Sequence, residues 1–231
     1  SGEGQFHHDS ISFNTRISAG NSDLNINVAK YNHDISVDLK HVNFDLEDFN
    51  FLNKKSFLPK HINFEGFCFL KNFGLSNTTL QGDLSMDYGD ITYLLELDSL
   101  KKDNILIEFK DFNIGQLINK HSIGKINALA SLSFIGQKVD SFLLDVSNLS
   151  YNGYNYNNIF LKGQLSDDKG NVFAKISDKN IDVHASAYLK KKNNYDSWYS
   201  PIFSNLNGQV YHANLYNLKI PVNQSIDFMS T

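Results

Sequence analysis

Apolar residues recur at every second position along most of this 231-residue chain. The clearest run spans residues 181–190, where Ile, Val, Ala, Ala and Leu alternate with Asp, His, Ser, Tyr and Lys. The same alternation occupies residues 11–17, 24–28, 35–39, 91–97 and 105–109. Successive side chains of a strand point to opposite faces, so each segment has one apolar and one polar face. The pattern predicts an all-β chain of about fourteen to sixteen short strands.

The composition agrees with this fold class. The chain has 18 Phe, 11 Tyr and 1 Trp, and about one residue in eight is Asn. Aromatic and β-branched residues favour strands, whereas Asn, Asp, Ser and Gly favour tight turns. The hydrophobic fraction of 41% excludes a wholly disordered chain, and the net charge of -4 argues against a general nucleic-acid binder. The single Cys excludes an internal disulfide framework and a zinc site built on thiolates.

Turn and helix signals interrupt the strands. Asn152-Gly153 predicts a type I′ hairpin, and Gly20-Asn21 and residues 168–171 predict two further hairpin tips. Helical spacing is rare. Residues 114–118 predict one short helix, and residues 46–52 are a weaker second candidate.

The chain contains no apolar run as long as the ~18 residues of a membrane-spanning helix. Its start, Ser1-Gly2-Glu3-Gly4, lacks the basic and apolar regions of a signal peptide. We therefore expect residues 1–9 to be a tag remnant or a disordered start. Residues 10–231 are expected to form one continuous unit.

An apolar-x-small-x-apolar pattern recurs four times. Its central positions are Gly82, Ala128, Gly163 and Gly208. The spacing fits a degenerate repeat of several antiparallel strands, and it equally fits glycines at the bends of a curved sheet. The two interpretations are compatible.

No motif indicates catalysis. The histidines lack metal-ligand spacing, and Cys68 lies in an apolar stretch typical of an inert buried thiol. The prediction is a protein without enzymatic activity, catalytic residues, metal or cofactor. Lys190-Lys191-Lys192 favours a solvated turn or a charged sheet edge over a site for anionic lipid. Tyr151, Tyr154 and Tyr156 favour aromatic pairing at a hairpin over a sugar-binding platform.

A sheet that is apolar on one face of every strand must cover that face. A second sheet, an enclosing barrel or a non-protein ligand can cover it, and this chain has too few helices to do so. An unclosed sheet curling over its own apolar face leaves a continuous groove that can hold acyl chains. Each methylene removed from water contributes about 0.8 kcal/mol, so a 16-carbon chain in water costs roughly 12 kcal/mol.

The order of several short segments resembles a known family. The segments are Phe109–Ile118, Ser122–Ala128, Leu149–Ile159 with the following Gly163–Leu165, and Ile176–Val183. Together they resemble the TamB (translocation and assembly module, AsmA-like) proteins of the Bacteroidetes type. The family often has Asp-Pro-Asn in the last segment, where Lys179 replaces the Pro. The resemblance extends over residues 109–218 and is fainter over residues 42–98.

The resemblance implies a segment of a longer periplasmic protein with an N-terminal inner-membrane anchor. Family members span the envelope as a β-sheet rolled into a taco-like groove with an apolar lining. They associate with an Omp85-class outer-membrane barrel of the TamA type. They are implicated in phospholipid movement between the membranes and in the assembly of outer-membrane proteins.

We therefore expect a long, strongly curved antiparallel sheet with an open taco-like groove and one or two short helices. The expected function is to shield phospholipid acyl chains as one section of a bridge between the membranes. The residues predicted to line the groove are Leu80, Leu84, Tyr93, Leu95, Ile126, Leu132, Phe134, Ile181 and Val183. Two alternatives remain open: a glycan-binding β-sandwich of a surface protein, and a scaffold that pairs its open edge with client strands.

Overall fold

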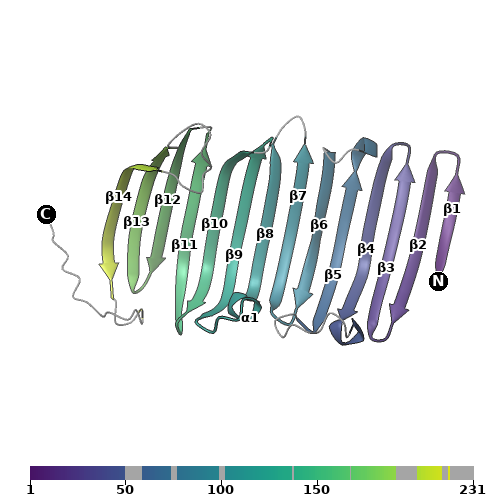
Figure 1. The fold of residues 1–231 in the computed structure, drawn as a ribbon, viewed down its shortest axis with the longest axis horizontal. Helices are drawn as coiled ribbons and strands as arrows, with labels where there is room; N and C mark the ends of the chain where they lie inside the picture. The colour runs from purple at the N-terminus through teal and green to yellow at the C-terminus, as the bar shows by residue number, and fades with distance from the viewer. Residues whose placement is uncertain are drawn as a thin grey trace.

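The described residues form a single sheet of fourteen strands, β1 to β14 (Figure 1). The computed structural model describes residues 1–49, 59–73, 77–98, 102–136, 138–166, 168–190, 202–214 and 218. The strands are β1 (Gly2–His7), β2 (Ser10–Ala19), β3 (Ser22–Tyr31), β4 (Asp34–Asp45), β5 (His61–Leu70), β6 (Asn77–Met86), β7 (Gly89–Asp98), β8 (Asp103–Asn113), β9 (Ile123–Ile135), β10 (Lys138–Tyr151), β11 (Tyr154–Leu165), β12 (Lys169–Asp178), β13 (Ile181–Lys190) and β14 (Ile202–Ala213). Each strand pairs antiparallel with its neighbours in sequence, and β1 does not pair with β14. The predicted all-β class and open antiparallel sheet are confirmed.

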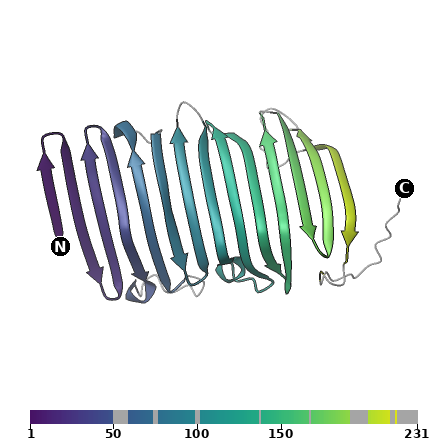
Figure 2. The same cartoon turned by 180° about the vertical axis from the view of Figure 1, so that it is seen from behind.

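The described strands lie side by side in one layer, as the two opposite views show (Figures 1 and 2). The helical elements are short and lie at strand ends: α1 (Ile114–Leu117) and the 3-10 turns η1 (Leu46–Phe49) and η2 (Lys71–Phe73). A single sheet differs from the two packed sheets of the sandwich alternative, so that architecture is wrong. None of the helices in the described part of the chain is long and apolar enough to cross a membrane.

Two of the predicted hairpins are confirmed. Asn152 and Gly153 both have positive φ, 50° and 73°, and join the directly paired Tyr151 and Tyr154. Positive φ at both central residues is the requirement of a type I′ turn, which Asn-Gly meets at low steric cost. Gly20, with φ of 61°, likewise turns the chain between β2 and β3.

The hairpin tip predicted at residues 168–171 lies earlier in the chain, between the end of β11 at Leu165 and the start of β12 at Lys169. Lys169 to Asn171 belong to β12, and the Ser166 amide donates to the Lys169 carbonyl at 2.7 Å across the tip. Gly170 pairs with Leu165 on one side and Leu189 on the other. It therefore continues the alternation of β12 instead of turning the chain.

The start of the chain is ordered, which differs from the disordered alternative predicted for residues 1–9. Gly2 to His7 form β1, which pairs along its whole length with β2. Phe6 lies opposite Ile11, so this strand continues the apolar alternation of the sheet. Phe6 nevertheless stays 78% exposed, because β1 has a neighbour on one side only.

The predicted helix at residues 114–118 is confirmed as α1. The Asn113 side chain caps it by accepting from the Gln116 amide at 3.1 Å. Ile114 packs against the most deeply buried cluster of the described residues, which consists of Tyr88, Phe112, Ile126, Ala128 and Val146. Of the second predicted helix, residues 46–49 form η1, and residues 50–52 lie outside the described residues.

β-Bulges shift the register at several points of the sheet. Residues 110 and 111 of β8 oppose the single residue Asn127 of β9. The Asp111 amide donates to Asn127 Oδ1 at 2.7 Å, and Asn127 Nδ2 donates to Asp111 Oδ1 at 3.3 Å. Further shifts occur between β3 and β4, β4 and β5, β9 and β10, and β13 and β14. A bulge bends its strand and increases the local twist, so these positions curve the sheet.

A polar cluster joins the ends of β11 and β12. The buried Tyr154 hydroxyl donates to Asp178, and Asn180 Nδ2 donates to the Tyr154 oxygen at 2.8 Å. Asn157 Nδ2 also donates to Asp178, at 2.8 Å. Burial works to raise the pKa of Asp178, but these hydrogen bonds outweigh it and the pKa is lowered. Burial and the bond to Asp178 raise the pKa of Tyr154.

The ring of Tyr154 also makes an edge-to-face contact with the ring of Tyr156, with centroids 4.8 Å apart. These two rings therefore have partners in the hairpin, as predicted.

Candidate functional site: an uncovered apolar face

The strand pairing assigns every described strand residue to one of two faces. In an antiparallel sheet, directly paired residues lie on the same face, and so do alternate residues of one strand. Following the pairs from β5 to β14 gives three adjacent rows on one face. The first is Phe64, Leu84, Ile91, Phe109, Ala128, Val146, Ile159, Ile176, Val183 and Val210; the second is Gly66, Gly82, Tyr93, Ile107, Ala130, Leu144, Leu161, Ala174, Ala185 and Gly208; the third is Cys68, Leu80, Leu95, Ile105, Leu132, Phe142, Gly163, Val172, Ala187 and Leu206.

This surface, called the apolar face below, continues across the remaining strands. Phe44, Val42, Leu39, Val37 and Ile35 of β4 pair with the apolar-face residues of β5. Leu24, Ile26 and Val28 of β3 follow, then Ile11, Phe13 and Ile17 of β2. Within the described strands, the apolar face therefore extends from β2 to β14, and its polar members include Thr15, Lys30 and Asp103. With thirteen steps of about 4.8 Å between fourteen strands, the sheet is about 62 Å long.

All nine residues predicted to line a groove lie on the apolar face. Leu84 and Val183 belong to the first row, Tyr93 to the second, and Leu80, Leu95 and Leu132 to the third. Ile126, Phe134 and Ile181 lie further along the same faces of β9 and β13. The register thus brings the nine positions onto one surface, although they come from four strands.

The middle row is rich in small residues. Gly66 and Gly82 pair directly, and a Cβ atom on Gly82 would lie 2.7 Å from the Tyr93 hydroxyl. The Tyr93 ring stacks on Phe64 at 6.1 Å with an interplanar angle of 11°. Burial raises the pKa of Tyr93, so this hydroxyl stays neutral at physiological pH. Ala174, Ala185 and Gly208 make the row low over β12 to β14, whereas Tyr93, Ile107, Leu144 and Leu161 make it bulkier over β7 to β11. The recurrent apolar-x-small-x-apolar pattern corresponds to this face.

The apolar side chains cover one another only in part. Leu132 in the middle of the sheet is 36% exposed, and Leu206 on β14 is 66% exposed. The apolar face is thus an open surface, and no described element forms a second layer over it.

The opposite surface, called the polar face below, forms hydrogen bonds between strands. Ser85 Oγ donates to Asp90 at 2.6 Å, Thr92 Oγ1 to Asp83 at 2.6 Å, Ser133 Oγ to Asn104 at 2.8 Å, and Ser150 Oγ to Asn155 at 2.7 Å. The guanidinium of Arg16 binds both carboxylate oxygens of Asp23 at 3.2 and 3.0 Å, and this bond lowers the pKa of Asp23. These contacts link neighbouring strands on the solvent-exposed polar face, whereas the opposite face consists mainly of apolar side chains.

The remaining candidate groups are scattered. Cys68 is half-buried on the apolar face between Val37 and Leu80, in keeping with the predicted apolar environment of its thiol. Among the residues whose placement is described, no three His, Cys, Asp or Glu side chains come together as a possible metal site. Lys190 ends β13, whereas Lys191 and Lys192 lie outside the described residues.

Comparisons of the chain with protein-family models, with curated proteins and with solved structures find no match. Function is therefore inferred from the geometry of the two faces and from the resemblance of the sequence segments.

Proposed function

We propose that the apolar face shields the acyl chains of phospholipids as one section of a bridge between two membranes. The observation that supports this function is the predominantly apolar surface that extends from β2 to β14, over which no described element packs. The occupant must be apolar and fit a surface that varies little along the sheet. Acyl chains meet both conditions, because they lack polar groups that would need partners in the sheet.

The energetics favour a continuous surface over a single deep pocket. A 16-carbon chain in water costs roughly 12 kcal/mol, so a lipid that crosses an aqueous gap must keep apolar contact throughout. The rows of the apolar face repeat Leu, Ile, Val and Phe from strand to strand. Positions of similar affinity let a chain slide, whereas one tight pocket would retain it.

The setting of this function follows the family resemblance. The proposal places the chain in the periplasm, within a longer protein anchored in the inner membrane. Its proposed partners are phospholipid and an Omp85-class outer-membrane barrel of the TamA type, and it would also support outer-membrane protein assembly.

A second candidate function has one observation in its favour. The outer side of β14 pairs with no described strand, although Ile202–Ala213 is twelve residues long. An open edge of this length can add a strand from another protein, as a scaffold for client strands would.

Photo-crosslinking tests the main proposal. We expect a phospholipid with a diazirine in its acyl chain to label peptides of the apolar face and to co-purify in lipid extracts analysed by mass spectrometry. Labelling confined to β14 would favour the edge scaffold. A lipid-free protein that light scattering shows to be a dimer, with one apolar face covering the other, would refute the proposal. Two such faces are wide enough to form a stable interface.

A further inference from the structure

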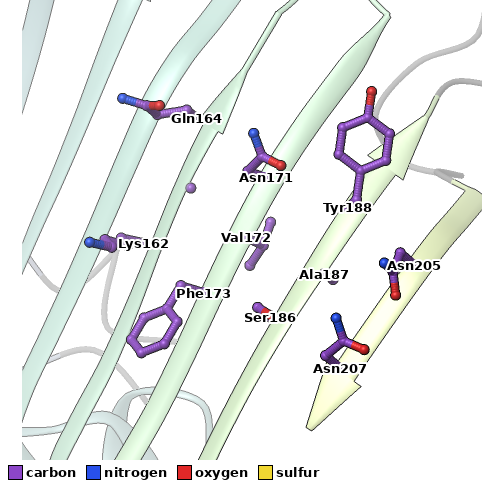
Figure 3. Close-up of a pocket in the computed structure, with 11 residues that line it drawn as sticks. Lys162, Gln164, Asn171, Val172, Phe173, Ser186, Ala187, Tyr188, Asn205 and Asn207 are labelled. Carbon is purple, nitrogen blue, oxygen red and sulfur yellow. The ribbon is translucent and has the colours of Figure 1, made fainter.

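A hollow on the polar face lies over the last four strands. It has a volume of about 400 Å³ and is lined from β11, β12, β13 and β14 (Figure 3). Two rows of paired residues form most of it: Lys162, Phe173, Ser186 and Asn207 in one, and Gln164, Asn171, Tyr188 and Asn205 in the other. Ser186 is the shortest side chain in either row, so the surface is lowest above it.

Aromatic rings cross this region diagonally. Phe160, Phe173 and Tyr188 lie on successive strands, each shifted by two residues, and the rings of Phe160 and Phe173 are 6.4 Å apart. Phe173 and Tyr188 lie at opposite ends of the hollow (Figure 3). Diagonal neighbours in a sheet are about 7–8 Å apart, so the two rings bracket the short Ser186.

The polar groups of the hollow differ from several of those elsewhere on the polar face. The side chains of Ser85, Thr92 and Ser133 bond across strands. In the hollow, the side chains of Gln164, Asn171, Ser186, Asn205 and Asn207 make no hydrogen bond to another described residue. Four amides and a hydroxyl therefore present free donors and acceptors beside two aromatic rings.

The scarcity of charged residues in the lining of the hollow limits the class of ligand that it can bind. Its lining includes no carboxylate, and Lys162 is its one charged residue. Lys162 Nζ lies 5.7 Å from the centre of the Phe173 ring and 5.9 Å from that of Phe160, so it already has a cation–π partner. A nucleic acid requires several cations to bind its phosphates, and a metal ion requires carboxylates or imidazoles.

We propose that this hollow binds a neutral saccharide. One side of a sugar ring is a C–H surface that packs on an aromatic ring, and its hydroxyls match amides that both donate and accept. A second hollow of about 450 Å³ shares Phe173, Ser186 and Asn207 and extends past His184, which fits an oligosaccharide. The site lies on the face opposite the acyl-chain surface, so the two proposals stand or fall separately.

Calorimetric titration and saturation-transfer NMR of the 231-residue chain test the site, with cellotetraose, maltotetraose and tri-N-acetylchitotriose as probes. We expect saturable binding of at least one probe. Phe173→Ala and Ser186→Trp, which fills the hollow, should each weaken it at least about tenfold. Phe67→Ala is the matched control: Phe67 is on the polar face of β5 and stacks with Phe69 at 6.5 Å, far along the sheet.

Circular dichroism identifies any variant that fails to fold. Ser186→Trp removes no side-chain hydrogen bond to a described residue, so it reports on the site even if Phe173→Ala destabilises β12. Failure of all three probes to bind would overturn the proposal. Equal affinity of Ser186→Trp and the unmodified chain would also overturn it.

Discussion

Leu132 and Leu129 offer a direct test of which face carries apolar ligands. Both are leucines of β9, and they are 36% and 37% exposed. Leu132 lies on the apolar face between Ile105 and Phe142. Leu129 lies on the polar face, where it pairs with Glu108 and Asp145. The two positions thus match in strand, residue type and exposure, and they differ in face.

Arginine at the two positions should have opposite consequences. A charge on a lipid-contacting strand face costs about 2–4 kcal/mol, which corresponds to a roughly 30- to 800-fold loss of affinity at that position. Leu132→Arg should therefore strongly reduce acyl-chain retention. Leu129→Arg places its guanidinium between two carboxylates in water, where an ion pair contributes at most about 1 kcal/mol. It should leave retention unchanged.

The assay is the yield of photo-crosslinking to a diazirine-labelled phospholipid, with urea unfolding as the measure of stability. Both leucines are partly exposed to a similar degree, so the arginine side chains can extend into water and neither substitution should unfold the chain. Equal crosslinking of the two variants would refute the assignment of the apolar face. A loss confined to Leu129→Arg would reverse that assignment.

Two further predictions concern stability. Asp178→Asn should cost about 1.5–3 kcal/mol at neutral pH, measured by urea unfolding, because it weakens the hydrogen bonds from Tyr154 and its neighbours. The folded-state pKa of Asp178 is lowered, so its contribution is present above the unfolded pKa of about 3.9 and is lost as pH falls through the folded value. The pKa of Tyr154 is raised, so the contribution of this hydroxyl to stability is present below pH ~10 and is lost at higher pH. A stability difference between Asp178→Asn and the unmodified chain that does not change with pH would contradict this account. Gly115→Ala should destabilise the chain by more than about 2 kcal/mol, because its Cβ would lie 1.7 Å from the Ile123 carbonyl oxygen, whereas Gly208→Ala has room and should change thermal stability little.

Sequence periodicity predicted the two faces because alternation is a local property of each strand. Ile181 and Val183 share a face whatever their neighbours are, and pairing apolar with apolar residues then aligns successive strands. The Asn152-Gly153 turn was equally predictable, since few residue pairs accept two positive φ angles. Gly170 was assigned to a turn because a strand glycine and a turn glycine look alike until the pairing partners are known.

The polar-face hollow required the pairing of distant residues. Lys162, Phe173, Ser186 and Asn207 come from four strands, and only the register places them in one row. The sequence does carry a signal, because Phe160 and Phe173 are aromatic at positions where the alternation predicts polar side chains. Alternation alone does not predict the uncovered apolar face, because an alternating strand packs equally well in a sandwich or an open sheet. The expectation of an open sheet comes from the scarcity of helices and from the family resemblance.

The strand order, in which every strand pairs only with its neighbours in sequence, also affects how such a protein can change during evolution. Inserting or deleting one hairpin alters the sheet length by about 9.6 Å and leaves the remaining pairs intact. Strand length sets the width of the sheet independently. The span of the molecule and the breadth of its apolar surface can therefore evolve separately, as in repeat proteins whose units contact only adjacent units.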